Sequence, residues 1–196
     1  IILSGYFLGS VYFTSNGMNT LSTAGIYDIF VAKLDPAGEH IWSMRFGDSA
    51  DQRALGVAVD GGNNVLVTGR CNGTLSFGGP NLSCGPLQPD LFVVKFDPQG
   101  GHVWSKSFGD GNDADIKEGK SIAADSNGDV LVTGRFRGTL DFIDGDTPLM
   151  TASSLSDVFV TKLAGATGTA LWSRKFGASG DQIGESVAAD ANGNVI

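Results

Sequence analysis

The chain has 196 residues, a formal net charge of -8 and 41% hydrophobic residues, so it can bury a sizeable core and is not a disordered chain. The excess of Asp and Glu over Lys and Arg argues against a nucleic-acid or anionic-membrane surface, and no apolar stretch approaches the ~18 residues that a membrane-spanning helix needs. With 29 Gly and only 17% charged residues, the composition favours a turn-rich β protein.

A unit of four short strands recurs along the chain. In the copy from Gly56 to Phe108, the strands are expected at 56–60, 65–70, 91–96 and 102–106, each bounded by turn residues. The third strand reads D-x-F-V-x-K and the fourth carries a tryptophan followed by Phe-Gly. These features recur at Asp28, Asp90 and Asp157, at Trp42, Trp104 and Trp172, and at Phe46, Phe108 and Phe176. Such self-similarity is typical of repeat architectures, and the tryptophans are interpreted as blade core.

Four antiparallel strands in tandem repetition predict an all-β fold, a β-propeller made of four-stranded antiparallel blades. The expected blade units are 1–55, 56–120 and 121–185, with the start of a further blade at 186–196. Because propellers have four or more blades, about three blades predict a partial ring of a larger propeller. Further blades of the same chain, or a second copy, are expected to close the ring.

The two ends of the chain fall within the same strand of the unit. Residues 1–5 match 65–69, residues 195–196 match 65–66, and neither an initiator Met nor a signal peptide is present. We therefore expect this sequence to be a segment of a longer chain.

The blocks DIFVAKLDPAGEHIWSMRFG, VAVDGGNNVLVTGR and GTLSFGG resemble the bacterial seven-bladed β-propeller repeat family, SBBP, over essentially the whole chain. The third copy departs from the pattern, since Lys162-Leu163-Ala164 lacks the turn Asp and Pro and one extra residue precedes Trp172. The resemblance implies a secreted or cell-surface bacterial protein and supplies no catalytic residues.

Strand parity predicts two different rims. The first-to-second and third-to-fourth turns are tight and share one rim, whereas the long, variable connections 71–89, 136–156 and 109–118 share the other. Binding residues usually lie on such loops, so this rim is the predicted ligand surface. Its candidate residues are acidic or amide side chains of the inter-blade loops: Asp48, Asp51, Gln52, Asp110, Asp113, Asp115, Asp181 and Gln182.

One run in these loops could bind Ca²⁺. Asp110, Asn112, Asp113 and Asp115 offer alternating oxygen ligands, but the run lacks the glycine and the distal Glu of an EF-hand loop. The alternative is that these short side chains only hold turns. No metal or other cofactor is otherwise predicted.

The two cysteines, Cys71 and Cys84, lie 13 residues apart across a predicted turn, where a hairpin could bring them together. A disulfide is predicted in an oxidising compartment, the alternative being two free thiols.

No enzymatic motif is complete. The Gly119-Lys120-Ser121 run resembles the end of a phosphate-binding loop, but Ala114 occupies its first glycine position and no helix follows. His40 and His102 occupy equivalent positions before two tryptophans, which favours a structural role. The sequence therefore predicts a non-catalytic binding or scaffold module with a protein or glycan ligand. A purely structural spacer array, or part of a propeller hydrolase or lyase whose site lies in missing blades, are the alternatives.

Overall fold

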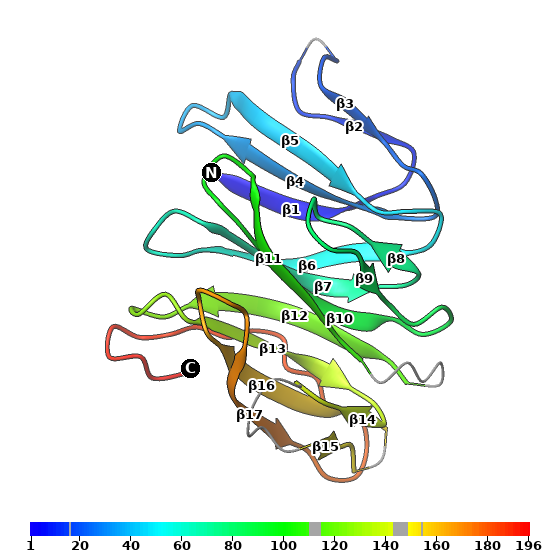
Figure 1. The fold of residues 1–196 in the computed structure, drawn as a ribbon, viewed down its shortest axis with the longest axis vertical. Helices are drawn as coiled ribbons and strands as arrows, with labels where there is room; N and C mark the ends of the chain where they lie inside the picture. Colours follow the sequence, from blue (N-terminus) through cyan, green and yellow to red (C-terminus); the bar gives the residue numbers. More distant parts are fainter. Residues whose placement is uncertain (16, 110–114, 143–148, 154) are drawn as a thin grey trace.

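The computed structural model describes residues 1–15, 17–109, 115–142, 149–153 and 155–196. Three antiparallel sheets follow one another along the long axis of the molecule (Figure 1). Blade 1 has three strands, β1 (Ile2–Phe7), β4 (Asp28–Leu34) and β5 (His40–Phe46). Blade 2 has four: β6 (Gln52–Val59), β7 (Val65–Cys71), β10 (Asp90–Phe96) and β11 (His102–Phe108). Blade 3 repeats them as β12 (Lys117–Ala124), β13 (Val130–Phe136), β16 (Asp157–Leu163) and β17 (Ala170–Phe176).

A small hairpin follows the second strand of every unit. These hairpins are β2 (Ser10–Tyr12) with β3 (Thr20–Ser22), β8 (Thr74–Leu75) with β9 (Leu82–Ser83), and β14 (Thr139–Leu140) with β15 (Met150–Thr151). The described ranges contain strands and turns but no helix, and hence no helix that could cross a bilayer. The prediction of an all-β, partial β-propeller is confirmed.

The first strands of blades 2 and 3 begin earlier than the sequence predicted. β6 starts at Gln52 and β12 at Lys117, whereas the apolar runs indicated 56–60 and 121–125. The ladder is interrupted by one extra residue between Ala54 and Gly56, and it resumes in register on the far side. This β-bulge lets the strand continue beyond the apolar run, into residues that looked like loop. The repeat boundaries at residues 56 and 121 fall inside β6 and β12.

The hydrophobic core lies between the blades, in two layers. One layer joins Ile29 and Val31 of blade 1 to residues of blade 2 that include Phe92 and Phe96. The other joins blade 2 to blade 3 and contains Trp104. The whole of β10 is buried, as expected for a third strand that is apolar on both faces. Each blade therefore depends on its neighbours for burial, which is the usual energetics of repeat proteins.

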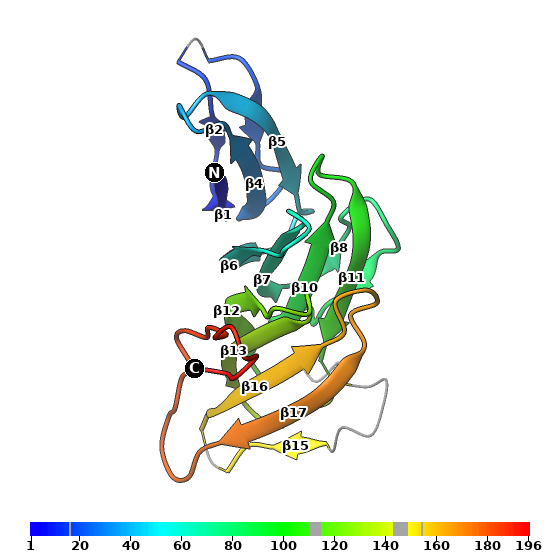
Figure 2. The same cartoon turned by 90° about the vertical axis from the view of Figure 1, so that its left-hand side faces the viewer.

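The turns and the hairpins lie on opposite sides of the sheets. Figure 1 shows the β6–β7 and β12–β13 turns at the left and the β8–β9 and β14–β15 hairpins at the right, as strand parity requires. The turned view in Figure 2 shows the successive sheets splaying apart like the blades of a fan. Even the aberrant third copy closes a tight turn, in which the Ala164 amide donates to the Thr169 carbonyl oxygen at 2.8 Å. We call the side with the tight turns the turn rim and the side with the hairpins the hairpin rim.

Candidate functional site

The aspartate that opens each D-x-F-V-x-K strand is a buried clamp at the hairpin rim. Asp28, Asp90 and Asp157 are at most 5% exposed. Their carboxylates accept the backbone amides of Ala24 at 2.8 Å, Gly85 at 2.8 Å and Ser153 at 3.0 Å, respectively. The aspartate thereby ties each hairpin connection to the third strand.

A glycine completes this clamp in each blade, and in blades 1 and 3 a cation joins it. The carboxylate of Asp157 receives Lys175 Nζ at 3.1 Å, and that of Asp28 pairs with Arg45. Burial raises the pKa of Asp157, but hydrogen bonds from Lys175 and Ser153 outweigh it and hold that pKa below its usual value. A Cβ on the glycine after the repeated phenylalanine (Gly47, Gly109 or Gly177) would collide with this carboxylate, which explains the Phe-Gly pair.

Asp48 and Gln52, both predicted to contact ligand, bond to one another, to their own loop and to the start of the hairpin connection of blade 2. Gln52 is fully buried, and its Nε2 donates to Asp48 Oδ1 and to the Asn72 carbonyl oxygen, both at 2.7 Å. Asp48 also accepts the amides of Ala50 at 2.8 Å and Thr74 at 2.9 Å. Although burial raises the pKa of Asp48, these hydrogen bonds lower it overall. The side chain of Gln52 is therefore not exposed on the surface, and its hydrogen bonds stabilise the loop.

The other predicted rim residues are scattered among different environments. Asp51 forms an ion pair with Arg53, whereas Asp181 is exposed and Gln182 bonds within its own loop at Ser179. Asp115 approaches Gly138. Asp110, Asn112 and Asp113 lie outside the described residues, so the calcium hypothesis stays a prediction; within the described ranges no group of metal ligands is found.

The predicted disulfide is confirmed. Cys71 and Cys84 are bonded, with their Cα atoms 5.7 Å apart, and both are buried. The bridge joins the end of β7 to the residue after β9, so it closes the base of the β8–β9 hairpin.

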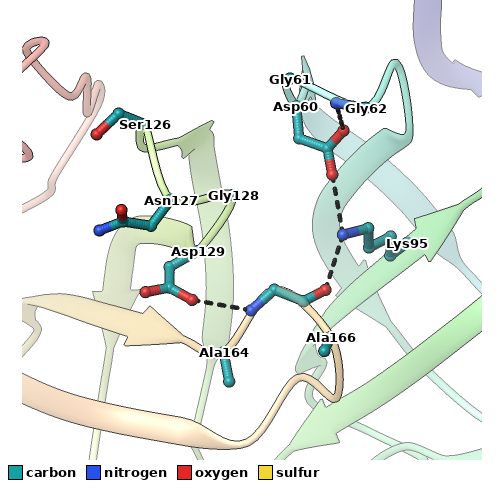
Figure 3. A pocket seen from close by; sticks show the side chains of 11 residues that line it. Asp60, Gly61, Gly62, Lys95, Ser126, Asn127, Gly128, Asp129, Ala164 and Ala166 are labelled. Atoms are coloured by element: carbon teal, nitrogen blue, oxygen red, sulfur yellow. Dashed lines mark hydrogen bonds and ion pairs between the residues drawn. The ribbon is translucent and has the colours of Figure 1, made fainter.

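One cavity lies on the turn rim, opposite the predicted ligand surface. It measures about 670 Å³ and lies between the first turns of blades 2 and 3 and the last turn of blade 3 (Figure 3). Lys95 crosses it, with Nζ 2.9 Å from Asp60 Oδ2 and 2.7 Å from the Gly165 carbonyl oxygen. Asp129 Oδ1 accepts the Gly165 amide at 3.1 Å.

These contacts make the cavity a seam between blades. Burial raises the pKa of Asp60, but hydrogen bonds from Asn64 and Lys95 lower it below the usual value, so the carboxylate stays ionised against the lysine. Lys162 and Asp125 repeat the pair in blade 3 at 2.6 Å. Because Lys95 already binds both neighbours, this cavity offers a ligand little unused charge.

A second cavity, which the sequence did not predict, lies at the hairpin-rim ends of the innermost strands. It measures about 180 Å³ and we call it the inner-strand cavity; its lining is mostly cationic, and comprises Tyr6, Arg53, Leu55, Arg70, Glu118, Lys120 and Arg135. The only sequence signal was the Arg that ends both V-L-V-T-G-R runs, at Arg70 and Arg135. The inner-strand cavity was not predicted from the sequence because its lining residues come from four strands of blades 2 and 3 and from Tyr6 of blade 1.

Exposed large apolar side chains mark the hairpin connections. Each connection carries at least one: Leu8, Tyr12, Met18 and Ile26 in the first, Leu87 in the second, and Leu149 and Leu155 in the third. The tight turns at 35–39, 60–64, 97–101, 125–129, 164–169 and 190–194 carry none. The hairpin connections and the tight turns therefore differ in chemistry as well as in length.

Comparison with known proteins agrees with this architecture. No protein-family model matches the chain. An uncharacterized WD repeat-containing protein of Acanthamoeba polyphaga mimivirus is 29% identical over 189 residues, which cover 86% of this chain and 13% of that relative. The chain thus spans only a small part of the length of the curated relative it matches. WD repeats form β-propeller blades, and the four-stranded antiparallel sheets described above are of the same type.

Proposed function

We propose that this chain is a non-catalytic binding module, part of a propeller that presents its hairpin rim to a protein ligand. The observation that carries the proposal is the distribution of exposed apolar side chains, which occur in every hairpin connection and in no tight turn. Exposed apolar groups on a rigid frame are typical of protein-protein interaction sites. The similarity to a WD repeat-containing protein supports a scaffold role rather than catalysis.

The hairpins are held in a way that suits binding. Buried carboxylates, the Asp48–Gln52 network and the disulfide tie their bases to the blades. Loops fixed before binding lose less conformational entropy when a partner docks. A glycan ligand is the second possibility that the same rim leaves open, and the test below includes it.

The setting of the module is part of the same proposal. The disulfide supports a secreted or cell-surface location, because such bonds persist in oxidising compartments. Membership of the SBBP family and a bacterial source rest on the repeat blocks alone, and the viral relative adds no support for them. Ring closure by further blades or a second copy is supported by the apolar side chains that remain exposed on the outer face of blade 3, such as Phe176 at 58%.

The proposal is tested with two matched triple variants. The rim variant carries Tyr12→Asp, Leu87→Asp and Leu155→Asp, at residues that are 52–74% exposed. The control carries Ile41→Asp, Val103→Asp and Leu171→Asp on the outer strands, at residues that are 45–52% exposed. Each immobilised protein is exposed to the extracellular proteins of the source organism and to a glycan array. We expect a defined protein ligand that wild type and control retain and the rim variant loses. Equal capture by all three, or by none, would refute the proposal, and retention of glycans alone would replace the protein ligand with a glycan.

A further inference from the structure

The inner-strand cavity gathers four cationic side chains from two blades. Arg53 and Arg70 come from β6 and β7, and Lys120 and Arg135 come from β12 and β13. Glu118 lies among them with its side chain only 3% exposed. Its carboxylate receives Arg135 Nε at 2.7 Å, Lys120 Nζ at 3.3 Å and Arg70 Nη1 at 3.4 Å.

The charges of this cluster do not balance. Besides Glu118, the cations contact one other carboxylate, that of Asp51, which takes Arg53 through two bonds of 2.8 and 2.9 Å and lies 3.8 Å from Arg70. Among the described residues, four positive groups thus face two negative ones, in a chain whose net charge is -8. The cationic side chains are only 22–26% exposed, so solvent screens this surplus incompletely.

The cationic groups are held in position before any ligand arrives. The guanidinium of Arg53 lies over the rings of Tyr27, at 4.3 Å, and of Tyr6, at 4.8 Å from the ring centroid. Lys120 occupies the extra position of the β-bulge between Gly119 and Ser121. A bulge re-aims the side chain it carries and is frequent beside binding sites. Preorganised donors of this kind bind anions without a further ordering cost.

We propose that the inner-strand cavity is an anion site that binds a phosphate group, either as inorganic phosphate or as a phosphate monoester. The surplus of two positive charges decides between ligands, because a carboxylate supplies one negative charge and a phosphate monoester about 1.5 to 2 at neutral pH. Size points the same way. At about 180 Å³ the cavity is smaller than the roughly 300–1,000 Å³ of pockets that enclose a whole small molecule. It therefore takes a compact charged group, and guanidinium forks suit its oxygens. This site does not include the exposed apolar residues of the hairpin connections, so the phosphate proposal does not depend on the proposed protein ligand.

The test uses Lys120→Leu, because Leu55 holds the equivalent bulge position in blade 2 and shows that the fold accepts this side chain there. The matched control is Arg174→Ala, which removes one exposed positive charge on the outer strand β17. Inorganic phosphate, phenyl phosphate and acetate are titrated into the whole chain by calorimetry, and melting temperatures are recorded for each protein.

We expect saturable binding of inorganic phosphate, and about tenfold weaker binding by Lys120→Leu, since a charge-assisted hydrogen bond contributes roughly 1.5 kcal/mol or more and 1.4 kcal/mol is tenfold. Arg174→Ala should bind as wild type does. Binding of phenyl phosphate in addition identifies an ester as an accessible source, whereas exclusion of phenyl phosphate identifies free phosphate. Absence of phosphate binding, acetate binding as tight as phosphate, or equal binding by a folded Lys120→Leu would each overturn the proposal.

Discussion

The lysine of the D-x-F-V-x-K strand joins each blade to the next. Lys95 Nζ bonds the Gly165 carbonyl oxygen of blade 3, and Lys33 Nζ bonds the Pro98 carbonyl oxygen of blade 2 at 2.8 Å. Within its own blade Lys95 also pairs with Asp60, which directly follows β6. A residue that looks in the sequence like an ordinary strand lysine is therefore a buried link between blades.

Replacing Lys95 with methionine should destabilise the chain by roughly 3 kcal/mol, because removing one partner of a buried ion pair leaves the other charge uncompensated. The side chain of Asp60 is only 4% exposed, although its bonds to Asn64 and Gly62 moderate the loss. Urea denaturation followed by tryptophan fluorescence measures the change. Lys33→Met is the control: in the described residues Lys33 has a carbonyl partner but no carboxylate, so about 1 kcal/mol is expected. Equal losses in the two variants would contradict this role for the Lys95–Asp60 pair.

At the scale of elements, local patterns predicted strands well but misplaced their ends. The apolar run began at 56, whereas β6 begins at Gln52 because the bulge lets pairing with β7 continue. This shift moves Gln52 from a presumed binding loop into a buried strand end. The disulfide was predictable because the two cysteines flank a turn within one connection, so only local geometry was needed.

The disulfide should stabilise the β8–β9 hairpin in particular. Cleavage of the Cys71–Cys84 bond by reductant, or the Cys71→Phe and Cys84→Ser double variant, is expected to cost about 3 kcal/mol, the chain-entropy value for a loop of this length. Phenylalanine is chosen because Phe7 and Phe136 end the equivalent strands. Limited proteolysis should then cut within 72–89 first, while the hairpin connection of blade 1, which has no cysteine, keeps its wild-type rate of cleavage. Unchanged stability and unchanged cutting would show that the buried carboxylate clamp alone holds the hairpin.

The whole molecule is an open stack of blades whose stability is shared through two inter-blade layers. Hydrogen-bonded aspartates lie at both rims: Asp60 and Asp125 at the turn rim, and Asp48 and Asp157 at the hairpin rim. In all four carboxyl groups, burial raises the pKa, but hydrogen bonds lower it by more than burial raises it. The pKa in the folded state therefore lies below that in the unfolded state.

This arrangement predicts acid lability. A carboxyl group whose pKa is lowered on folding binds more protons in the unfolded state than in the folded state. Its contribution to the free energy of unfolding is complete above the unfolded-state pKa of about 3.9, and it is lost as the pH falls through the folded-state pKa. The free energy of unfolding should therefore be nearly constant from about pH 7 to pH 5 and decline steeply below about pH 4. Urea denaturation at a series of pH values measures it, and Asp60→Asn should make the decline shallower. Stability that stays constant down to about pH 2.5 would contradict the assignment.

The four-stranded unit, the tight turns and the disulfide were predictable from the amino-acid sequence, because strand alternation, turn chemistry and cysteine spacing are local properties. The sequence showed the periodicity of Asp28, Asp90 and Asp157, but it did not show that their side chains are buried clamps. Tertiary structure alone decided which charges meet. Arg53 and Glu118 occupy equivalent positions of different blades, and they line one cavity only because β6 and β12 lie side by side in the stack. Contacts between blades can join residues that lie 48 to 70 positions apart in the chain, and no local pattern encodes such a distance.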